Sequence, residues 1–298
     1  MCQRTPLVVI IACIGILLNC CLPVSSQAQF RKNDRLLYRI TRSILPAQNV
    51  CEKVYQLTVL HTSKHDATIA CTLLYINDSV TSGKMRYHFI SSDSTTWHAW
   101  STETAAQIAL LYHPVILTVR NNDSTAVTQG LEATQSLAAI LEDARQRWNL
   151  PPQVVADLQW RIPMHLTMDV EKLFRHMPPK MEVGYQWRQG YDSCRVEKVT
   201  PEMVTISSFI PGVPTDSTSL KISGVYTLLR DKGTVDKLLD TLQLREDRIK
   251  YRMHATNITR IELLPADTPV PVTDMVRFDA QVYKGPWKQE SRPVPPKK

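Results

Sequence analysis

Alternating hydrophobic and polar positions dominate this chain and predict β-strands. In residues 84–90, Met85, Tyr87 and Phe89 alternate with Arg86 and His88. Such a period of two places one face of a strand against a core and the other in water. Turn-forming polar clusters separate similar runs on both sides of the middle of the chain. The predicted strands cover residues 35–41, 54–61, 67–76, 84–90, 115–120, 182–189, 194–199, 203–209, 219–229, 237–244 and 249–261.

The middle of the chain changes to a helical period. Apolar residues fall on one stripe of a helix predicted over residues 131–148, which the prolines at 151 and 152 end. The stripe consists of Leu137, Ile140, Leu141, Ala144 and Trp148. Two short helices are predicted next, at 153–160 and 169–176. Thr167 is expected to cap the second of them, with Asp169 near its positive end.

The expected fold class is therefore α+β, mainly β. We expect two curved antiparallel β-sheet blocks, or one large sheet, packed against a helical insert. The expected organisation is a signal peptide (1–28), an N-terminal β block (29–130), a helical insert (131–177), a C-terminal β block (178–264) and a Pro-rich, partly disordered tail (265–298). No βαβ alternation occurs, which argues against a doubly wound nucleotide-binding fold.

The first residues predict export. Arg4 precedes an apolar run at 7–18, and small residues at 26 and 28 suit a cleavage site. The run is too short for a transmembrane helix, so none is expected in the mature chain. Processing as a lipoprotein at Cys20 or Cys21 is the alternative, less favoured because Asn19 stands where a small residue is preferred. The expected location is the periplasm or the extracellular space.

Charge and cysteine content narrow the functional classes. The formal net charge is +7, but the basic residues form no stripe with interleaved aromatic residues, so nucleic acid is not an expected partner. After removal of a signal peptide, Cys51, Cys71 and Cys194 remain. A bond between Cys51 and Cys71 is possible in an oxidising compartment, whereas buried single thiols are the favoured interpretation.

No recognisable catalytic motif is present. The phosphate-binding patterns GxxxxGK[ST] and GxGxxG, the GxSxG elbow and HExxH are all absent from the sequence. His61 and His65 are four residues apart, but they fall in an expected hairpin loop, where this spacing does not bring two metal ligands together. We therefore predict no catalytic residues, no metal site and no cofactor.

The densest aromatic and polar cluster comprises Trp97, His98, Trp100 and Glu103. As a binding site, its indole rings would stack on a sugar or an apolar ligand, and His98 and Glu103 would hydrogen-bond to that ligand. The competing interpretation is a sheet edge that simply buries two indole rings, because tryptophan commonly fills cores. These four residues are the candidate ligand-binding residues of the sequence.

Residues 173–187 (LFRHMPPKMEVGYQW) place a short helix and prolines before a Val-Gly-x-x-Trp pattern. Residues 222–226 (ISGVY) and 231–235 (DKGTV) follow. This arrangement resembles a family of secreted envelope proteins of unknown function from Gram-negative bacteria, over most of the mature chain. The double proline at 178 and 179 departs from that family's single proline. The resemblance implies architecture and an envelope location, and no catalytic residues.

The sequence thus favours a non-enzymatic exported protein that binds a ligand or partner, such as a lipophilic molecule or an envelope protein, through a curved sheet. Two alternatives stay open. One is a hydrolase whose site is assembled from dispersed residues. The other is a structural envelope protein that pairs with a partner through exposed sheet edges.

Overall fold

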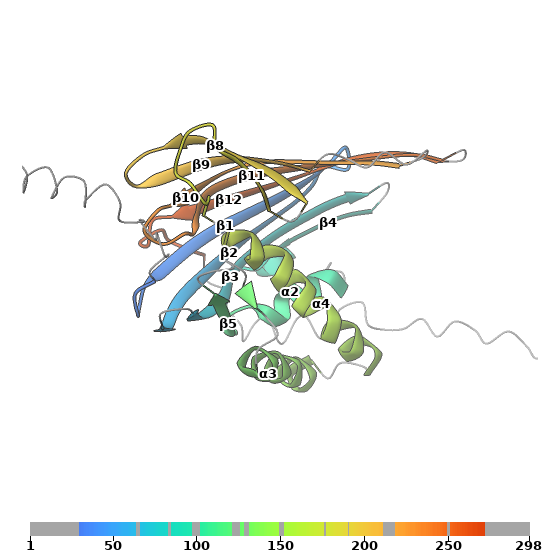
Figure 1. The fold of residues 1–298 in the computed structure, drawn as a ribbon. Helices are drawn as coiled ribbons and strands as arrows, with labels where there is room; N and C mark the ends of the chain where they lie inside the picture. Colours follow the sequence, from blue (N-terminus) through green and yellow to red (C-terminus); the bar gives the residue numbers. More distant parts are fainter. Residues whose placement is uncertain are drawn as a thin grey trace, which may run out of the picture.

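The computed structural model describes residues 30–63, 66–82, 85–96, 102–120, 126–127, 131–148, 152–175, 177–189, 191–210, 218–248 and 251–271. Figure 1 shows one large twisted sheet with helices gathered on one of its faces. We call this the helix-bearing face. The prediction of a mainly β fold is confirmed.

The strands form a single antiparallel sheet of twelve strands in the order β6-β5-β3-β2-β1-β12-β11-β10-β9-β8-β7, with β4 paired to β3. The first half of the sheet is built from β1 (Arg35–Leu45), β2 (Asn49–Thr62), β3 (Asp66–Ser82), β4 (Met85–Ile90), β5 (Val115–Arg120) and β6 (Ala126–Val127). The second half is built from β7 (Gln186–Gln189), β8 (Asp192–Val199), β9 (Met203–Ile210), β10 (Thr218–Leu229), β11 (Val235–Arg248) and β12 (Tyr251–Leu264).

The two predicted strand blocks are joined edge to edge. Strand β1 pairs on one side with β2 and on the other with β12, from Leu37 opposite Leu264 to Leu45 opposite Thr256. The expectation of two separate sheets is therefore wrong, and the one-sheet alternative holds. The physical reason is that β1 and β12 each present a full row of backbone groups, and pairing them removes two long edges.

Helices cover only part of the sheet. They are α2 (Thr102–Leu110), α3 (Leu131–Trp148) and α4 (Pro152–Val170), with 3-10 turns η1 (Ser94–Thr96) and η2 (Glu171–Leu173). In Figure 1 the ribbons of β10, β11 and β12 continue past these helices. None of the helices in the described part of the chain is both long and apolar enough to cross a membrane.

The helix prediction for 131–148 is confirmed by α3, but the two short helices predicted after it are wrong. The chain forms one helix, α4, which continues through Pro163 and ends at Val170. Leu158, Ile162, Leu166 and Val170 repeat every four residues and are each 1% exposed or less. Burial of this stripe outweighs the hydrogen bond that Pro163 cannot donate. Asp169 consequently lies near the C-terminal end of a helix, and not at the start of one.

The main core lies between the helices and the sheet. Tyr38, Tyr55, Leu57 and Tyr226 point from the helix-bearing face into it and are at most 2% exposed. The opposite face carries a small cluster of Leu37, Val54 and Leu264, against which Val270 packs. Farther along that opposite face, Val225 and Leu239 are 49% and 45% exposed.

The cysteines are single thiols. Cys51, Cys71 and Cys194 are all free, so the interpretation as single thiols is confirmed and the alternative of a bond between Cys51 and Cys71 is wrong; Cys71 and Cys194 are buried, as expected, and Cys51 is partly buried. The register explains why: Cys51 lies opposite Asp78, whereas Cys71 lies opposite Leu57.

Candidate functional site

A row of polar residues crosses the helix-bearing face of the sheet. The pairing register places Ser208 opposite Gly224, Gly224 opposite Asp240, and Asp240 opposite Thr259. The row continues from Thr259 to Arg42 and from Arg42 to Cys51. We call it the polar row. Side chains of a row lie next to one another across neighbouring strands, so residues far apart in sequence meet beneath the end of α4.

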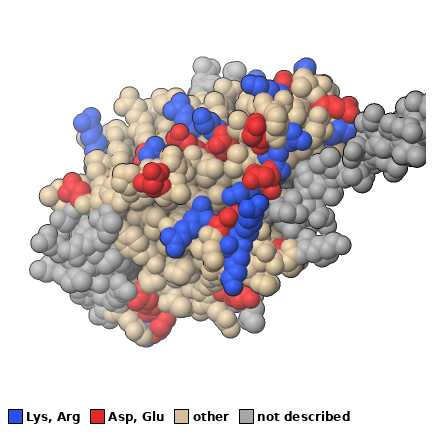
Figure 2. Space-filling model, turned by 90° about the vertical axis from the view of Figure 1, so that its left-hand side faces the viewer, with Lys and Arg blue, Asp and Glu red and all other residues tan. Residues whose placement is uncertain are grey.

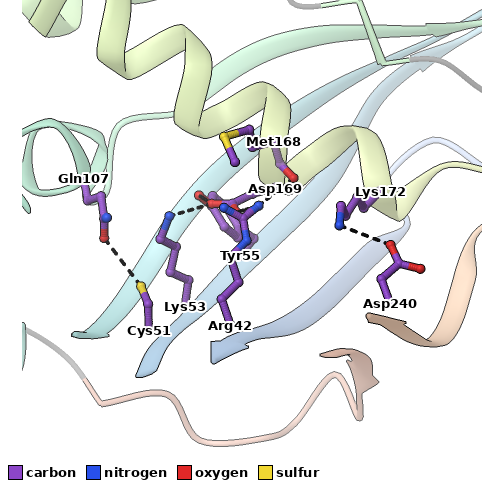
Figure 3. A network of polar contacts seen from close by, with 9 residues as sticks. All are labelled: Arg42, Cys51, Lys53, Tyr55, Gln107, Met168, Asp169, Lys172 and Asp240. Atoms are coloured by element: carbon purple, nitrogen blue, oxygen red, sulfur yellow. Dashed lines mark hydrogen bonds and ion pairs between the residues drawn. The ribbon is translucent and has the colours of Figure 1, made fainter. Parts of the chain in front are cut away.

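Asp169 of α4 is held by three residues of the sheet, as Figure 3 shows. Its Oδ2 accepts hydrogen bonds from Lys53 Nζ and from the Tyr55 hydroxyl, each at 2.7 Å. Arg42 Nη2 forms an ion pair with Asp169 Oδ1 at 2.6 Å and donates a hydrogen bond to the Met168 carbonyl oxygen at 2.7 Å. The Asp169 side chain is fully buried. This cluster fastens the C-terminal end of α4 to strands β1 and β2.

The electrostatics of this cluster depend on its two cations. Burial would raise the pKa of Asp169, but Lys53 and Arg42, with the hydrogen bonds from Lys53 and Tyr55, outweigh it, and the pKa is lowered. A carboxylate at a helix C-terminus also faces the negative end of the helix dipole. The two cations overcome both effects. The pKa of Tyr55 is raised, first by burial and then by Asp169, so its hydroxyl stays a donor.

A second ionic cluster lies on the other side of Arg42 along the polar row. Asp240 Oδ2 lies 3.1 Å from Lys172 Nζ and 3.4 Å from Arg175 Nη2. The Arg175 guanidinium also lies over the ring of Tyr226, 5.4 Å from its centroid. The Asp240 side chain is 12% exposed, against 32% for Lys172 and 21% for Arg175. These contacts hold η2 and the residues after it against strands β10 and β11.

Gly224 makes room for this second cluster. A Cβ atom at Gly224 would overlap Asp240 Oδ1 and would lie 3.0 Å from Ser208 Oγ. The Asp240 carboxylate therefore occupies the space that a side chain at the opposite position on β10 would fill. Glycine is required here by close approach of a neighbouring side chain.

We expect Gly224→Ala to lower the free energy of unfolding by about 1–3 kcal/mol, because the added methyl group pushes Asp240 away from its cations. Urea unfolding of the wild type, Gly224→Ala, Asp240→Ala and the double variant forms a thermodynamic cycle. In the Asp240→Ala background, the added methyl group should cost much less. An equal cost in both backgrounds would show that contact with Asp240 does not explain the glycine.

A pocket of about 400 Å³ lies where the two clusters meet. Its roof is the end of α4 with η2, and its floor is the polar row together with the next row of the sheet. In that next row Ile210 faces Ile222, Ile222 faces Leu242, and Leu242 faces Asn257. The lining residues are Arg42, Thr167, Met168, Glu171, Lys172, Arg175, Asp192, Ser208, Ile210, Ile222, Asp240, Leu242, Asn257 and Thr259. The pocket is thus amphipathic, with charged groups at one end and aliphatic groups at the other.

The reactive groups near the pocket are not tuned for nucleophilic chemistry. Burial raises the pKa of Cys51 to about 12, and it raises the pKa of Cys194 as well. Both thiols therefore stay protonated and unreactive near neutral pH. Burial also raises the pKa of Asp192, with Arg175 opposing the shift and Asp240 adding to it. In the described ranges, no group of three or more His, Cys, Asp or Glu residues could hold a metal ion.

The aromatic cluster singled out in the sequence is not part of this pocket's lining. Trp97, His98 and Trp100 lie outside the described residues. Glu103 belongs to helix α2, but its side chain is likewise outside what is described. A ligand-binding role for these four residues stays a prediction.

The residues of the two ionic clusters and of the pocket were missed, although the sequence carries a signal for some of them. Lys53 precedes Tyr55, Leu57 and Val59 with the same alternation, so it falls on the apolar face of β2. Asp240 likewise falls between Leu238 and Leu242. A charged residue on the apolar face of a strand needs a buried partner of opposite charge, and this requirement marks candidate sites.

The surface provides no large area of a single charge on the side seen in Figure 2, where positive and negative side chains are interspersed. On the face of the sheet opposite the helices, oppositely charged side chains form pairs. Arg39 lies 3.7 Å from both Glu52 and Glu262, which belong to the two strands that flank β1. Exposed pairs of this kind contribute little to stability.

Comparison with known proteins assigns no family. No protein-family model matches the sequence, and no curated protein matches it. Among solved structures, one described as lipid–protein interactions in lipovitellin has a TM-score of 0.48 at 9% identity, over 82% of this chain and 27% of that chain. An outer membrane channel from Pseudomonas putida F1 has a TM-score of 0.22 at 7% identity, over 82% and 100% of the two chains. This chain spans only about a quarter of the lipovitellin chain, and both likenesses are too low to assign a shared fold or a function.

Proposed function

We propose that this protein is a non-enzymatic binding protein that holds a lipophilic ligand in the pocket between the end of α4 and strands β8–β12. The observation that carries this proposal is the row of Ile210, Ile222 and Leu242, which lies on the helix-bearing face beside a polar row. Beneath the helices this face is tightly buried, whereas these three side chains are partly exposed and line the pocket.

The size and chemistry of the pocket support a small ligand. Small-molecule sites are concave, mostly apolar, and carry a few placed polar groups, within roughly 300–1,000 Å³. A pocket of about 400 Å³ is at the small end of this range. Met168, 46% exposed, extends the aliphatic wall from the roof. Transfer of apolar ligand surface from water to this wall provides the driving force for binding.

The test is binding of Nile red, a neutral apolar dye, to the purified mature protein. We expect the wild type to bind the dye, and Leu242→Gln to weaken binding about tenfold, because an amide replaces an aliphatic wall. The matched control is Leu239→Gln. Leu239 lies on the same strand but on the opposite face, where it is 45% exposed, and this variant should bind the dye as the wild type does.

Dye fluorescence would be titrated for all three proteins, after circular dichroism has shown that each variant keeps its strand content. Equal weakening by Leu242→Gln and Leu239→Gln would place the dye outside the pocket. No binding to the wild type would contradict the proposed function.

The alternative of pairing through sheet edges receives less support. Among the described strands, the edges of the sheet include β6 (Ala126–Val127), β7 (Gln186–Gln189) and β4 (Met85–Ile90), which pairs only with β3; all three are short strands with few backbone groups to offer. Short edge strands are one means by which proteins avoid pairing with other chains.

The alternative of a hydrolase also receives less support. The thiols, whose pKa values are raised, are not activated nucleophiles, and the imidazole of His165 is buried and is not an accessible base.

We further propose that the chain acts outside the cytoplasm, as an exported envelope protein. The support is in the sequence: Arg4, the apolar run at 7–18 and the small residues before position 29 follow the order of a secretory signal. Membership of the Gram-negative envelope family rests on residues 173–187 and 222–235 and stays a prediction.

A further inference from the structure

The charged side chains that line the pocket balance one another. Arg42, Lys172 and Arg175 supply the positive charges, and Glu171, Asp192 and Asp240 supply the negative ones. The buried groups behind Arg42 add one charge of each sign, from Lys53 and Asp169. The formal charge of the lining is therefore zero, with or without that deeper layer.

The positive groups are already engaged with carboxylates. Arg42 pairs with Asp169 at 2.6 Å, and both Lys172 and Arg175 contact Asp240. An anionic head group would have to share these cations with the carboxylates that already neutralise them. Its own charge would then stay uncompensated in a lining whose formal charge is zero, which is costly. A cationic head group would likewise add an uncompensated positive charge, since Asp240 is already shared by two cations and the charges of Glu171 and Asp192 are already matched within a lining whose formal charge is zero.

The polar row also offers uncharged hydrogen-bonding groups. Ser208 and Thr259 flank Gly224 and Asp240 in the row, and their hydroxyl groups can both donate and accept. Asn257, in the neighbouring row, adds an amide between Leu242 and the pocket's polar end. Hydroxyl and amide groups of a ligand can exchange hydrogen bonds with such a surface at no cost in unpaired charge.

From this balance, and resting on the proposed function, we infer that the ligand is a single-chain amphiphile with an uncharged, hydroxyl- or amide-bearing head group. Its head lies over the polar row near Lys172 and Asp240, and its chain lies along Ile210, Ile222 and Leu242. The small volume of the pocket favours one chain over two.

The experiment compares three amphiphiles with the same twelve-carbon chain: glycerol monolaurate, laurate and dodecylammonium. Each is titrated into the mature protein at pH 8 by isothermal calorimetry, below its critical micelle concentration. We expect glycerol monolaurate to bind about tenfold or more tightly than either charged amphiphile, because only the charged heads leave an unpaired charge in the pocket.

Two variants with opposite charge changes show whether the lining charges set this preference. Lys172→Gln removes one positive charge and should shift selectivity toward dodecylammonium and away from laurate. Asp192→Asn removes one negative charge and should shift selectivity the other way. Both side chains are partly exposed, so these isosteric or near-isosteric changes should leave the fold intact, as thermal melting would verify.

The outcomes separate the inference from the function on which it rests. If none of the three amphiphiles binds, and Nile red does not bind either, the proposed function fails. If the wild type binds laurate or dodecylammonium as tightly as glycerol monolaurate, the pocket binds amphiphiles but the inferred head group is wrong. A preference for glycerol monolaurate that neither variant shifts would also overturn the inference, because charge balance would then not be its cause.

Discussion

Asp169→Asn is expected to lower the free energy of unfolding by about 3–5 kcal/mol, the range for breaking a buried ion pair on one side. The amide cannot neutralise Lys53 and Arg42, whose side chains are 4% and 16% exposed. Two largely buried cations would then stay close together without the carboxylate that they share. Urea unfolding followed by circular dichroism measures the loss as a lower midpoint with an unchanged slope.

The control for this variant is on the same helix. Asp157 pairs with Arg161 at 2.7 Å, but both side chains reach solvent. We expect Asp157→Asn to cost less than about 1 kcal/mol, as exposed pairs usually do. Similar losses for Asp157→Asn and Asp169→Asn would mean that the buried cluster does not fasten α4 to the sheet.

The second large effect is a loss of stability in mild acid that depends on His165. This imidazole lies one turn before Asp169 on α4 and is 3% exposed. Burial, with Lys53 and Arg42 adding to its effect, lowers the pKa of His165 from its ordinary 6.5 to about 4. The unfolded chain therefore binds a proton in this pH window that the folded chain does not. Stability falls as pH drops from about 6.5 to about 4, by up to about 3 kcal/mol, and this contribution stays constant above and below that window.

His165→Gln should reduce the slope of stability against pH between pH 4 and 6.5, measured by urea unfolding at half-unit steps. Asp169 contributes to stability over a different pH range. Because its pKa is lowered in the folded protein, its contribution to stability is lost as pH falls through that lowered pKa. His88→Gln is the control, because His88 lies on β4 in an exposed position. If both variants keep the wild-type slope, His165 is not the residue responsible.

The strands and the helix at 131–148 could be predicted because the hydrophobic patterns that mark them lie within short stretches of sequence. The alternation at 84–90 and the apolar stripe at 131–148 correspond to β4 and α3. The full length of α4 could not be predicted in this way. The sequence suggested two short helices at 153–160 and 169–176, whereas burial of Leu158, Ile162 and Leu166 against the sheet depends on contacts that no local window contains.

The number of sheets could not be predicted from short stretches of sequence either. Whether β1 pairs with β12 depends on two segments separated by more than two hundred residues of chain. The same holds for the pocket. Ser208, Gly224, Asp240 and Thr259 come together only because the three pairings between their four strands are in matching register. A shift by one residue in any of these pairings would turn the side chains of that strand to the other face.

The central place of β1 has a consequence for how the chain must be assembled. Ribosomes deliver β1 and β2 early, but the neighbour that completes β1 on its other side, β12, ends at Leu264. Until that last segment emerges from the ribosome, one edge of the first strand of the nascent chain stays without its strand partner. Synthesis and final folding are thereby separated in time, and the ordered state is reached only once nearly all of the protein has been made.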